Sequence, residues 1–435
     1  MAAGRPFGAP PPGVDPPLRG IPAAEVGALP LLRLSAAWCL LEFLRSHLLS
    51  GFGWNLLAHT QWNWLRVIQI SDVTGGWGVS FLVVLVNATI YVVGTQYLFP
   101  CWQGVRGNKY CVPGICFLLL GAALSYGTLA LMGRPVPSVE GRFHVALLQG
   151  NVPQPKKWDE SFQEAIWKRY EQLVRQATEL KPNLIVWPET AVPGFLEDSA
   201  IRDRLNQIVR SAGVPMLVGA PTESSNSEHL YNSAILLSPQ GVVVERYDKV
   251  HLVPFGEFVP LKPLLGWINN VVPIGDFSPG SERTVFQTYS QPSSSGLTGG
   301  SDSRKILPFS VLICFEDLFP ELARNSVRAG ARWLLVVTND AWFERSAGSL
   351  QHLQCSVFRA VENRVWVGRA ANTGWTGFVT PWGEREGGIP RFKAGVAERK
   401  IFVHPSELTL YGRWGDWFLL VCAVIMGVPC KPSTN

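Results

Sequence analysis

The sequence predicts a layered α/β domain attached to a bundle of membrane helices. Charged residues make up only 16% of the 435 residues, below the roughly 25% of ordinary soluble domains. Residues 1–134 carry only eight Lys and Arg residues and four Asp and Glu residues. After residue 134, continuous apolar runs alternate with amphipathic helical patterns, as in sheets covered by helices. The first part is therefore expected in a membrane and the second in water.

Four segments divide the chain in this prediction. Residues 1–30 form a Pro-rich, disordered leader that lacks the features of a signal peptide. Residues 31–134 form the membrane region, and residues 135–414 form the α/β catalytic domain. Residues 415–435 form a short C-terminal membrane helix and a tail.

About three membrane helices are expected in the second segment: Leu31–Leu49, Trp77–Phe99 and Val112–Met132. The last two have no charged residue and are long enough to span a bilayer. The first carries Glu42 and Arg45, which lie on one helical face and can pair. Alternatively, these two side chains lie near the helix end and reach the membrane surface.

The charges between these helices predict the orientation of the chain. The loop between the second and third helices carries Arg106 and Lys109 and no acidic residue. By the positive-inside rule this loop is cytoplasmic, so the residues from about Arg134 to Trp414 lie outside the cytoplasm. The apolar run Trp417–Val428 is shorter than a usual span, but it can return the chain to the membrane.

Strand and helix patterns alternate in the catalytic domain, where runs such as LIVW and WLLVVT suit strands covered on both faces. The expected strands are His144–Gln149, Leu184–Trp187, Pro215–Gly219, Ala234–Leu237, Val242–Tyr247, Val311–Ile313, Trp333–Thr338, Val367–Ala370 and Gly377–Thr380. The expected helices are Ser161–Leu180, Ser199–Ala212, Leu318–Ala329 and Ser349–Val365. Two insertions interrupt the pattern. The apolar, Pro-containing Phe258–Gly280 should be hidden or contact lipid, and the Ser/Gly-rich Gln291–Ser303 should be a surface loop.

The cysteines, histidines and net charge exclude several classes of site. Six of the eight Cys residues lie in or beside apolar segments, and no C-x-x-C pair exists for a zinc or redox site. The seven His residues show neither H-x-H nor H-x-x-x-H spacing. The net charge of +5 comes without a long basic block, which argues against nucleic-acid binding. No metal, cofactor or nucleic acid is therefore expected.

Three motifs place a reactive polar residue where an apolar strand ends. The stretch LIVWPET puts Glu189 directly after a strand. The stretch YDKVHLVPFGE puts Lys249 at a strand end and Glu257 in the following loop. The stretch VLICFED puts Cys314 between a strand and a helix.

These residue types suit nucleophilic catalysis by a thiolate. A nearby cation such as Lys249, or the N-terminus of the helix at Leu318, lowers the pKa of a thiol. Glu189 could accept the thiol proton, and Lys249 could stabilise the oxyanion formed when the thiolate attacks a carbonyl. Any one of these residues alone is more often structural: a lone Cys is usually a small buried hydrophobe.

The motifs PET, DKVHLVPFGE and CFED together resemble those of the nitrilase (carbon–nitrogen hydrolase) superfamily. More specifically, the chain resembles its membrane branch, the apolipoprotein N-acyltransferases, over about residues 35–425. Further matching stretches are LQGNVPQ at 148–154 followed by Lys157 and Trp158, TNDAW at 338–342, RAANTG at 369–374 and YGRWGD at 411–416. The resemblance implies a nitrilase-like αββα sandwich attached to transmembrane helices.

The resemblance also assigns roles to individual residues. Cys314 is implied as the nucleophile, Glu189 as the general base and Lys249 as the cation that stabilises thiolate and oxyanion. Glu257 is implied to hold Lys249, and Glu316 to order the site. Trp158 matches a tryptophan near the substrate entrance, although it could equally pack at a helix start.

Two features depart from the family pattern. Phe315 stands where family members often have Tyr, so a hydroxyl is lost and an altered substrate contact is expected. Family members typically have seven spans before the catalytic domain, whereas three are predicted here. The first four spans are therefore expected to be missing from this chain.

The function implied is acyl transfer at the bacterial inner membrane, with the catalytic domain on the periplasmic side. A phospholipid donates a fatty acyl chain to Cys314 as a thioester. The N-terminal amine of a diacylglyceryl-cysteine lipoprotein then accepts it. Two alternatives remain open from the sequence: a membrane-tethered amidase or nitrilase that acts on a small C–N substrate, and an inactive truncated remnant.

Overall fold

The architecture was analysed in a computed structural model. It describes residues 24–25, 28–97, 105–106, 111–135, 142–224, 228–260, 276–289, 306–402 and 407–429. Most of the expected leader, residues 261–275 of the apolar insertion and the whole Ser/Gly-rich insertion lie outside the described residues.

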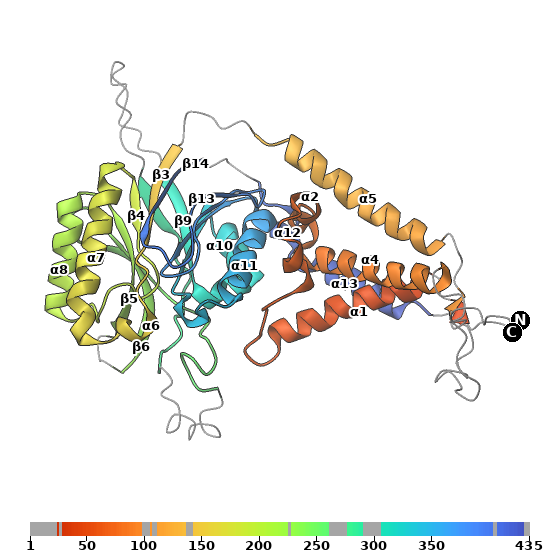
Figure 1. Ribbon diagram of the computed structural model, residues 1–435, viewed down its shortest axis with the longest axis horizontal. Coiled ribbons are helices and arrows are strands. Elements are labelled where there is room, and N and C mark those ends of the chain that lie inside the picture. The colour runs from red at the N-terminus through yellow and green to blue at the C-terminus, as the bar shows by residue number, and fades with distance from the viewer. Residues whose placement is uncertain are drawn as a thin grey trace, which may run out of the picture.

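A helical region is formed by the described residues between 28 and 135 together with those from 407 to 429 (Figure 1). Its helices are α1 (Ala28–His47), α2 (Leu65–Ile68), α3 (Ser71–Thr74), α4 (Gly76–Tyr97), α5 (Cys111–Met132), α12 (Leu410–Trp414) and α13 (Trp417–Gly427), with a 3₁₀ turn at Leu57–Gln61. Within the described ranges, α4 and α5 are the two helices long and apolar enough to cross a membrane. α13 is apolar but has only 11 residues. A short parallel pair, β1 (Ala24–Glu25) and β2 (Val105–Arg106), lies beyond these helices.

Two charged residues near the end of α1, Glu42 and Arg45, hold the chain that follows this helix. Glu42 Oε1 accepts a hydrogen bond from the backbone N–H of Leu57 at 2.7 Å. Arg45 Nη1 donates to the carbonyl of Trp54 at 2.7 Å. The sequence left open whether these side chains pair with each other or reach the membrane surface. In the structure both bind backbone groups of the next loop. Gly51 permits this turn because its φ is +74° and a Cβ would meet the carbonyl oxygen of Ser46.

Two six-stranded sheets form the α/β domain, residues 142–402. The first has the order β14-β3-β4-β5-β6-β7, with parallel pairing only among β3, β4 and β5. Its strands are β3 (Arg142–Gln149), β4 (Leu184–Val186), β5 (Met216–Glu223), β6 (Leu230–Leu237), β7 (Val243–Asp248) and β14 (Gly395–Phe402).

The second sheet has the order β13-β12-β11-β10-β9-β8. Its central strands β9, β10 and β11 run parallel, so their carboxyl ends lie at one edge. Its strands are β8 (Phe286–Tyr289), β9 (Ile306–Ile313), β10 (Trp333–Thr338), β11 (Trp366–Ala371), β12 (Thr376–Val379) and β13 (Arg385–Ile389).

The two sheets stack face to face and carry helices on their outer faces, which confirms the expected αββα sandwich (Figure 1). Side chains from both sheets, among them Leu147, Val186 and Leu335, share one buried core. A second core packs α7 (Glu160–Glu179) and α8 (Ser199–Ala212) on the first sheet. On the second sheet lie α10 (Pro320–Arg328) and α11 (Gly348–Asn363).

Three strands of the α/β domain escaped the sequence prediction: β8, β13 and β14. All three lie at sheet edges, where one side of the strand has no neighbour. β13 and β14 carry exposed charged residues such as Arg385 and Glu398 in place of an apolar run. Such edges are commonly polar, so no hydrophobic signal marks them.

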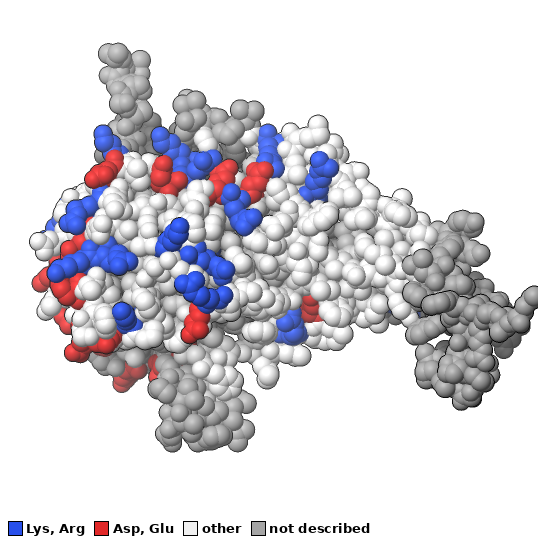
Figure 2. All heavy atoms as spheres, viewed as in Figure 1, with Lys and Arg blue, Asp and Glu red and all other residues white. Residues whose placement is uncertain are grey.

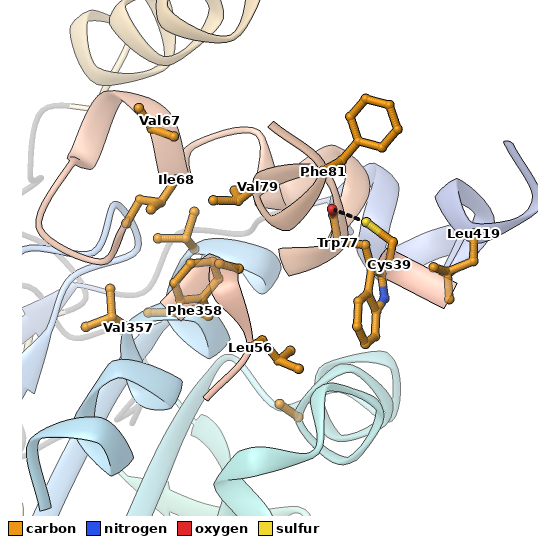
Figure 3. Packing of buried hydrophobic residues seen from close by; sticks show 14 of the residues in the cluster. Cys39, Leu56, Val67, Ile68, Trp77, Val79, Phe81, Val357, Phe358 and Leu419 are labelled. Atoms are coloured by element: carbon orange, nitrogen blue, oxygen red, sulfur yellow. Dashed lines mark hydrogen bonds between the residues drawn. The ribbon is translucent and has the colours of Figure 1, made fainter. Parts of the chain in front are cut away.

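The helical region packs directly on the α/β domain through α11. Figure 3 shows Val357 and Phe358 of α11 among Leu56, Ile68 and other side chains from the helical region. The same cluster includes Trp77, whose carbonyl accepts a bond from the Cys39 thiol at 3.3 Å. One continuous apolar core therefore fixes the helical region relative to the α/β domain.

Candidate active site

Cys314 follows β9 directly and adopts a left-handed backbone conformation, with φ at +53°. Such a conformation is uncommon for a residue with a side chain and marks a sharp turn. The chain continues as a 3₁₀ turn, Cys314–Leu318, and α10 begins only at Pro320. The expectation of a helix starting at Leu318 is therefore corrected: the turn, and not the N-terminus of α10, directly follows the sulfur.

The surroundings of Cys314 favour the neutral thiol. Burial raises the pKa of Cys314, the charge of Glu189 raises it further, and the charge of Lys249 lowers it. Lys249 does lower this pKa, as predicted. The pKa as a whole is nevertheless raised, so the prediction of a lowered thiol pKa is wrong. The residue remains partly accessible. A thiolate at this position therefore requires a neighbouring group that accepts the proton.

Lys249 follows β7 of the other sheet and is almost completely buried. Its Nζ lies 2.8 Å from Glu257 Oε2 and 3.8 Å from Glu189 Oε1. Burial would lower the pKa of Lys249, but the charges of Glu257 and Glu189 outweigh burial and raise it. The ammonium is therefore kept charged inside the protein.

Glu189 lies two residues beyond Trp187, which follows β4. Its Oε2 accepts a bond from the backbone N–H of Asn339 at 2.8 Å, and its Oε1 accepts one from Asn232 Nδ2 at 2.8 Å. The loop crosses β5 at Gly219, where a Cβ would lie 2.2 Å from the carbonyl oxygen of Pro188. A side chain at that position would displace the carboxylate, so only glycine fits.

The two assisting glutamates act on different partners. Glu257 Oε1 accepts bonds from Lys249 Nζ at 2.9 Å and Asn232 Nδ2 at 3.1 Å. Glu316 accepts hydrogen bonds from two backbone N–H groups: that of Val250, just after β7, at 2.8 Å and that of Ile313, at the end of β9, at 2.7 Å. It also accepts a hydrogen bond from the hydroxyl of Tyr247 at 2.8 Å. Burial raises the pKa of Glu316, and these donors work against that rise. Glu257 thus holds the ammonium, while Glu316 joins the turn after β7 to the end of β9.

The two candidate substrate contacts differ in exposure. Trp158 is 51% exposed at the end of the short helix α6 (Gln154–Lys157). Phe315 is buried and lies in an aromatic cluster with His251 and Phe319, at centroid distances of 5.8 and 5.2 Å. Trp158 is therefore available to a ligand, whereas Phe315 packs beneath the turn.

A buried polar network under the nucleophile was missed by sequence reasoning. Arg369 of β11 is fully buried and bonds Asp340 at 2.9 Å and Asp317 at 3.3 Å. Asp340 also lies 2.8 Å from His352 Nδ1, and His352 Nε2 lies 3.0 Å from the carbonyl oxygen of Cys314. Burial alone would raise the pKa of Asp340, but the charges of Arg369 and His352 hold it well below its usual range. Asp340 lies in the stretch TNDAW and Arg369 in the stretch RAANTG. Their place in these family-like stretches was the only signal in the sequence that could have indicated them.

The loop after α1 reaches the same network from the membrane side. Trp54 Nε1 donates to Gln351 Oε1 at 3.0 Å, and its ring lies 5.7 Å from that of His352. The carbonyl of Ser50 lies 2.9 Å from His251 Nε2, two residues after Lys249. The helical region therefore contacts both flanks of the site.

The residues gathered here can support acyl transfer through a thioester. They provide a partly accessible thiol, a carboxylate fixed by two donors and a buried ammonium beside that carboxylate. Within the described ranges, no group of three or more His, Cys, Asp or Glu side chains is placed to hold a metal ion.

Two protein-family models match the chain. The Carbon-nitrogen hydrolase model matches residues 144–403, and the model named Apolipoprotein N-acyltransferase N-terminal domain matches residues 20–89. The first match coincides with the α/β domain, and the second covers α1 and much of α4.

Curated relatives match almost the whole chain. The apolipoprotein N-acyltransferase of Geobacter metallireducens is 40% identical over 408 residues, which is 92% of this chain and 73% of that protein. The enzyme of the same name from Methylococcus capsulatus is 33% identical with the same coverage. Among solved structures, an amidase from Nesterenkonia sp. is 20% identical with a TM-score of 0.46, covering 66% of this chain and 98% of that one. A nitrilase-superfamily protein of Saccharomyces cerevisiae has the same identity and TM-score, with coverages of 62% and 93%.

Proposed function

Since the chain belongs to the apolipoprotein N-acyltransferases, whose catalytic part is a carbon–nitrogen hydrolase domain, we propose that Cys314, Lys249 and Glu189 carry out its acyl transfer. The protein is an N-acyltransferase of lipoprotein biosynthesis. The observation that carries the assignment of residues is their convergence from both sheets, with Lys249 Nζ 3.8 Å from Glu189 and electrostatically coupled to Cys314.

In the first half-reaction, Glu189 takes the proton of the Cys314 thiol. The thiolate attacks the ester carbonyl of a membrane phospholipid, and Lys249 stabilises the resulting oxyanion. The C–O bond breaks, and the leaving alkoxide takes the proton from Glu189. The products are a Cys314 thioester and a lysophospholipid.

In the second half-reaction, the N-terminal amine of a diacylglyceryl-cysteine lipoprotein attacks the thioester. Glu189 accepts a proton from the amine, the C–S bond breaks, and the thiolate regains that proton. The products are an amide and the free thiol. Two separate steps at one nucleophile predict ping-pong kinetics.

The proposed orientation places the catalytic domain on the outer side of the bacterial inner membrane. The apolar helices α4 and α5 support membrane insertion, and the cationic loop around Arg106 and Lys109 supports the direction. A reporter fused after Arg134 should give a non-cytoplasmic signal. A cytoplasmic signal would reverse the orientation.

The decisive experiment is intact-mass analysis of the full chain in detergent after incubation with a phospholipid of defined acyl chains. The wild type should gain the mass of one acyl group, which hydroxylamine removes. Cys314→Ala should gain none, and Cys355→Ala should behave as the wild type. Addition of a diacylglyceryl peptide should discharge the adduct to the peptide amine. No adduct in the wild type, or an adduct that persists in Cys314→Ala, would overturn the assignment.

The apolar insertion is proposed to contact lipid substrates. Replacing Leu264 and Leu265, which lie outside the described residues, with Asp should lower activity on lipids while a soluble ester is still turned over. Equal loss on both substrates would assign the insertion a structural role.

A further inference from the structure

A second lysine lies at the site, one position before the tryptophan that the sequence singled out. Lys157 ends α6, and only 6% of its surface is exposed. Its Nζ donates to the backbone carbonyl of Glu189 at 3.1 Å and to the hydroxyl of Thr190. Its neighbour Lys156 is exposed and lies over the ring of Phe162. Burying a lysine is unfavourable, so an interaction within the site must stabilise Lys157 in its buried position.

The charges of the site provide that interaction. Glu257 and Glu189 both face the single ammonium of Lys249, at 2.8 and 3.8 Å. One carboxylate charge would therefore remain uncompensated in a buried environment, which is unfavourable. An additional negative charge on Cys314 would be more unfavourable still. The carboxylate of Glu316 is also buried, but backbone N–H groups hold it. Among the remaining groups, a second buried ammonium balances Glu257 and Glu189 at two positive and two negative charges.

This charge balance is unchanged by the proton transfer from Cys314 to Glu189. When the proton moves from Cys314 to Glu189, the carboxylate charge disappears and a thiolate charge appears. The charges of both groups act on Lys157, so its ammonium interacts with the negative charge before and after the transfer. The charges of both groups also act on Lys249.

We propose that Lys157 is a positioning residue of the acyl transfer: it anchors the Glu189 loop and supplies the second positive charge that makes a buried thiolate possible at Cys314. The inference rests on the proposed role of Cys314. It extends that role to a residue that acts through Glu189 and the sulfur, without contact to substrate.

Other charged groups also face the sulfur. Asp340 raises the pKa of Cys314, and Asp340 is itself paired with Arg369. Hydrogen bonding to Thr338 lowers the thiol pKa. Asp340 is held by His352 and by Arg369, which it shares with Asp317. The charges that change beside the sulfur during the proton transfer are therefore balanced by the two lysines.

Burial lowers the pKa of Lys157 to about 8, and the charges of Glu189 and Cys314 oppose this shift. Lys157 is therefore charged at neutral pH and loses its charge as the pH rises above about 8. An arginine at this position stays charged throughout that range.

The test measures the alkylation of Cys314 by iodoacetamide between pH 6 and pH 10, in the full chain in detergent, by mass spectrometry of the Cys314 peptide. Lys157→Met should alkylate about tenfold more slowly than the wild type at pH 7.5, because the apparent thiol pKa rises by about one unit. Lys156→Met, the matched control, should alkylate as the wild type does. Lys157→Arg should retain the neutral-pH rate, and its rate relative to the wild type should increase between pH 7 and pH 9.

An unchanged pH profile of alkylation in a folded Lys157→Met would overturn the inference, since a merely structural lysine would not move the thiol pKa. If Lys157→Met does not fold, the comparison of Lys157→Arg with the wild type decides: a constant ratio across pH 7–9 overturns the inference. Alkylation needs no acyl donor. A wild type that fails to form the acyl adduct but shows these shifts would therefore refute the proposed function, while the electrostatic effect of Lys157 on the Cys314 thiol would stand.

Discussion

The helical region and the α/β domain distribute polar and apolar side chains in opposite ways. In Figure 2, Lys, Arg, Asp and Glu crowd the surface of the α/β domain and are nearly absent over the helices. The helical region exposes large apolar side chains such as Leu118 at 70% and Leu129 at 68%. The α/β domain instead buries charge at its centre, including Lys249 and Arg369.

This difference matches the proposed placement of the two regions in different solvents. Exposed leucines on α5 would be stable in lipid, where apolar surface has no reason to be hidden. Buried charges in the α/β domain persist only because each has partners, since an unpaired buried charge is strongly unfavourable. Four predictions test this comparison.

The largest effect is expected at the buried carboxylate of the site. Glu189→Gln removes the proton acceptor and should slow thioester formation by about 10²–10⁴-fold. Single-turnover acylation measured by intact mass checks it. Glu197→Gln, an exposed glutamate on the same loop, should retain the wild-type rate. A rate for Glu189→Gln within a few-fold of the wild type would contradict the role of general base.

The second prediction breaks a buried ion pair. Arg369→Met leaves Asp317 and Asp340 without their cation and should reduce the free energy of unfolding by about 3–5 kcal/mol. Chemical denaturation in detergent measures it. Arg399→Met removes a half-exposed pair with Glu386 and should change stability by about 1 kcal/mol or less. Similar denaturation midpoints for the two variants would show that burial does not determine how much an ion pair contributes to stability.

The third prediction places a charge on the apolar surface of each region. Leu118→Asp should oppose membrane insertion of α5 by about 2.5–3.5 kcal/mol. Val243→Asp, at an exposed apolar side chain of β7, should leave insertion unchanged. The fraction of protein retained in washed membranes measures both. Equal retention of both variants would mean that α5 does not face lipid.

The smallest effect concerns the junction of the two regions. Burial lowers the pKa of His59 to about 3, whereas an unfolded His titrates near 6.5. The unfolded chain therefore binds more protons between these values, so stability falls as the pH drops below about 6.5. At pH 5 the loss relative to pH 7 should be about 2 kcal/mol. Melting temperatures at pH 5 and pH 7 measure it, and His59→Gln should remove this part of the difference. An unchanged pH dependence in the variant would place the titrating group elsewhere.

The classes of element could be predicted from the sequence, and so could the candidate reactive residues. Alternation of apolar runs and amphipathic helices predicted the layers, and local motifs indicated Glu189, Lys249 and Cys314 as candidates. These signals are local, because the hydrophobic run of a strand and the residue types of a motif each extend over about ten positions or fewer. The polar edge strands β13 and β14 carried no such signal and were missed.

How these residues contact one another depends on the packing of the two sheets and could not be predicted from the sequence. The packing of the two sheets puts the N–H of Asn339 on Glu189, and it joins Asp317, Asp340 and Arg369 beneath the nucleophile. It also buried Lys157 and left Lys156 in solvent, a difference that two adjacent identical letters cannot show. Contacts between positions far apart in the chain depend on how the layers stack, and so do burial and the pKa shifts that follow from it.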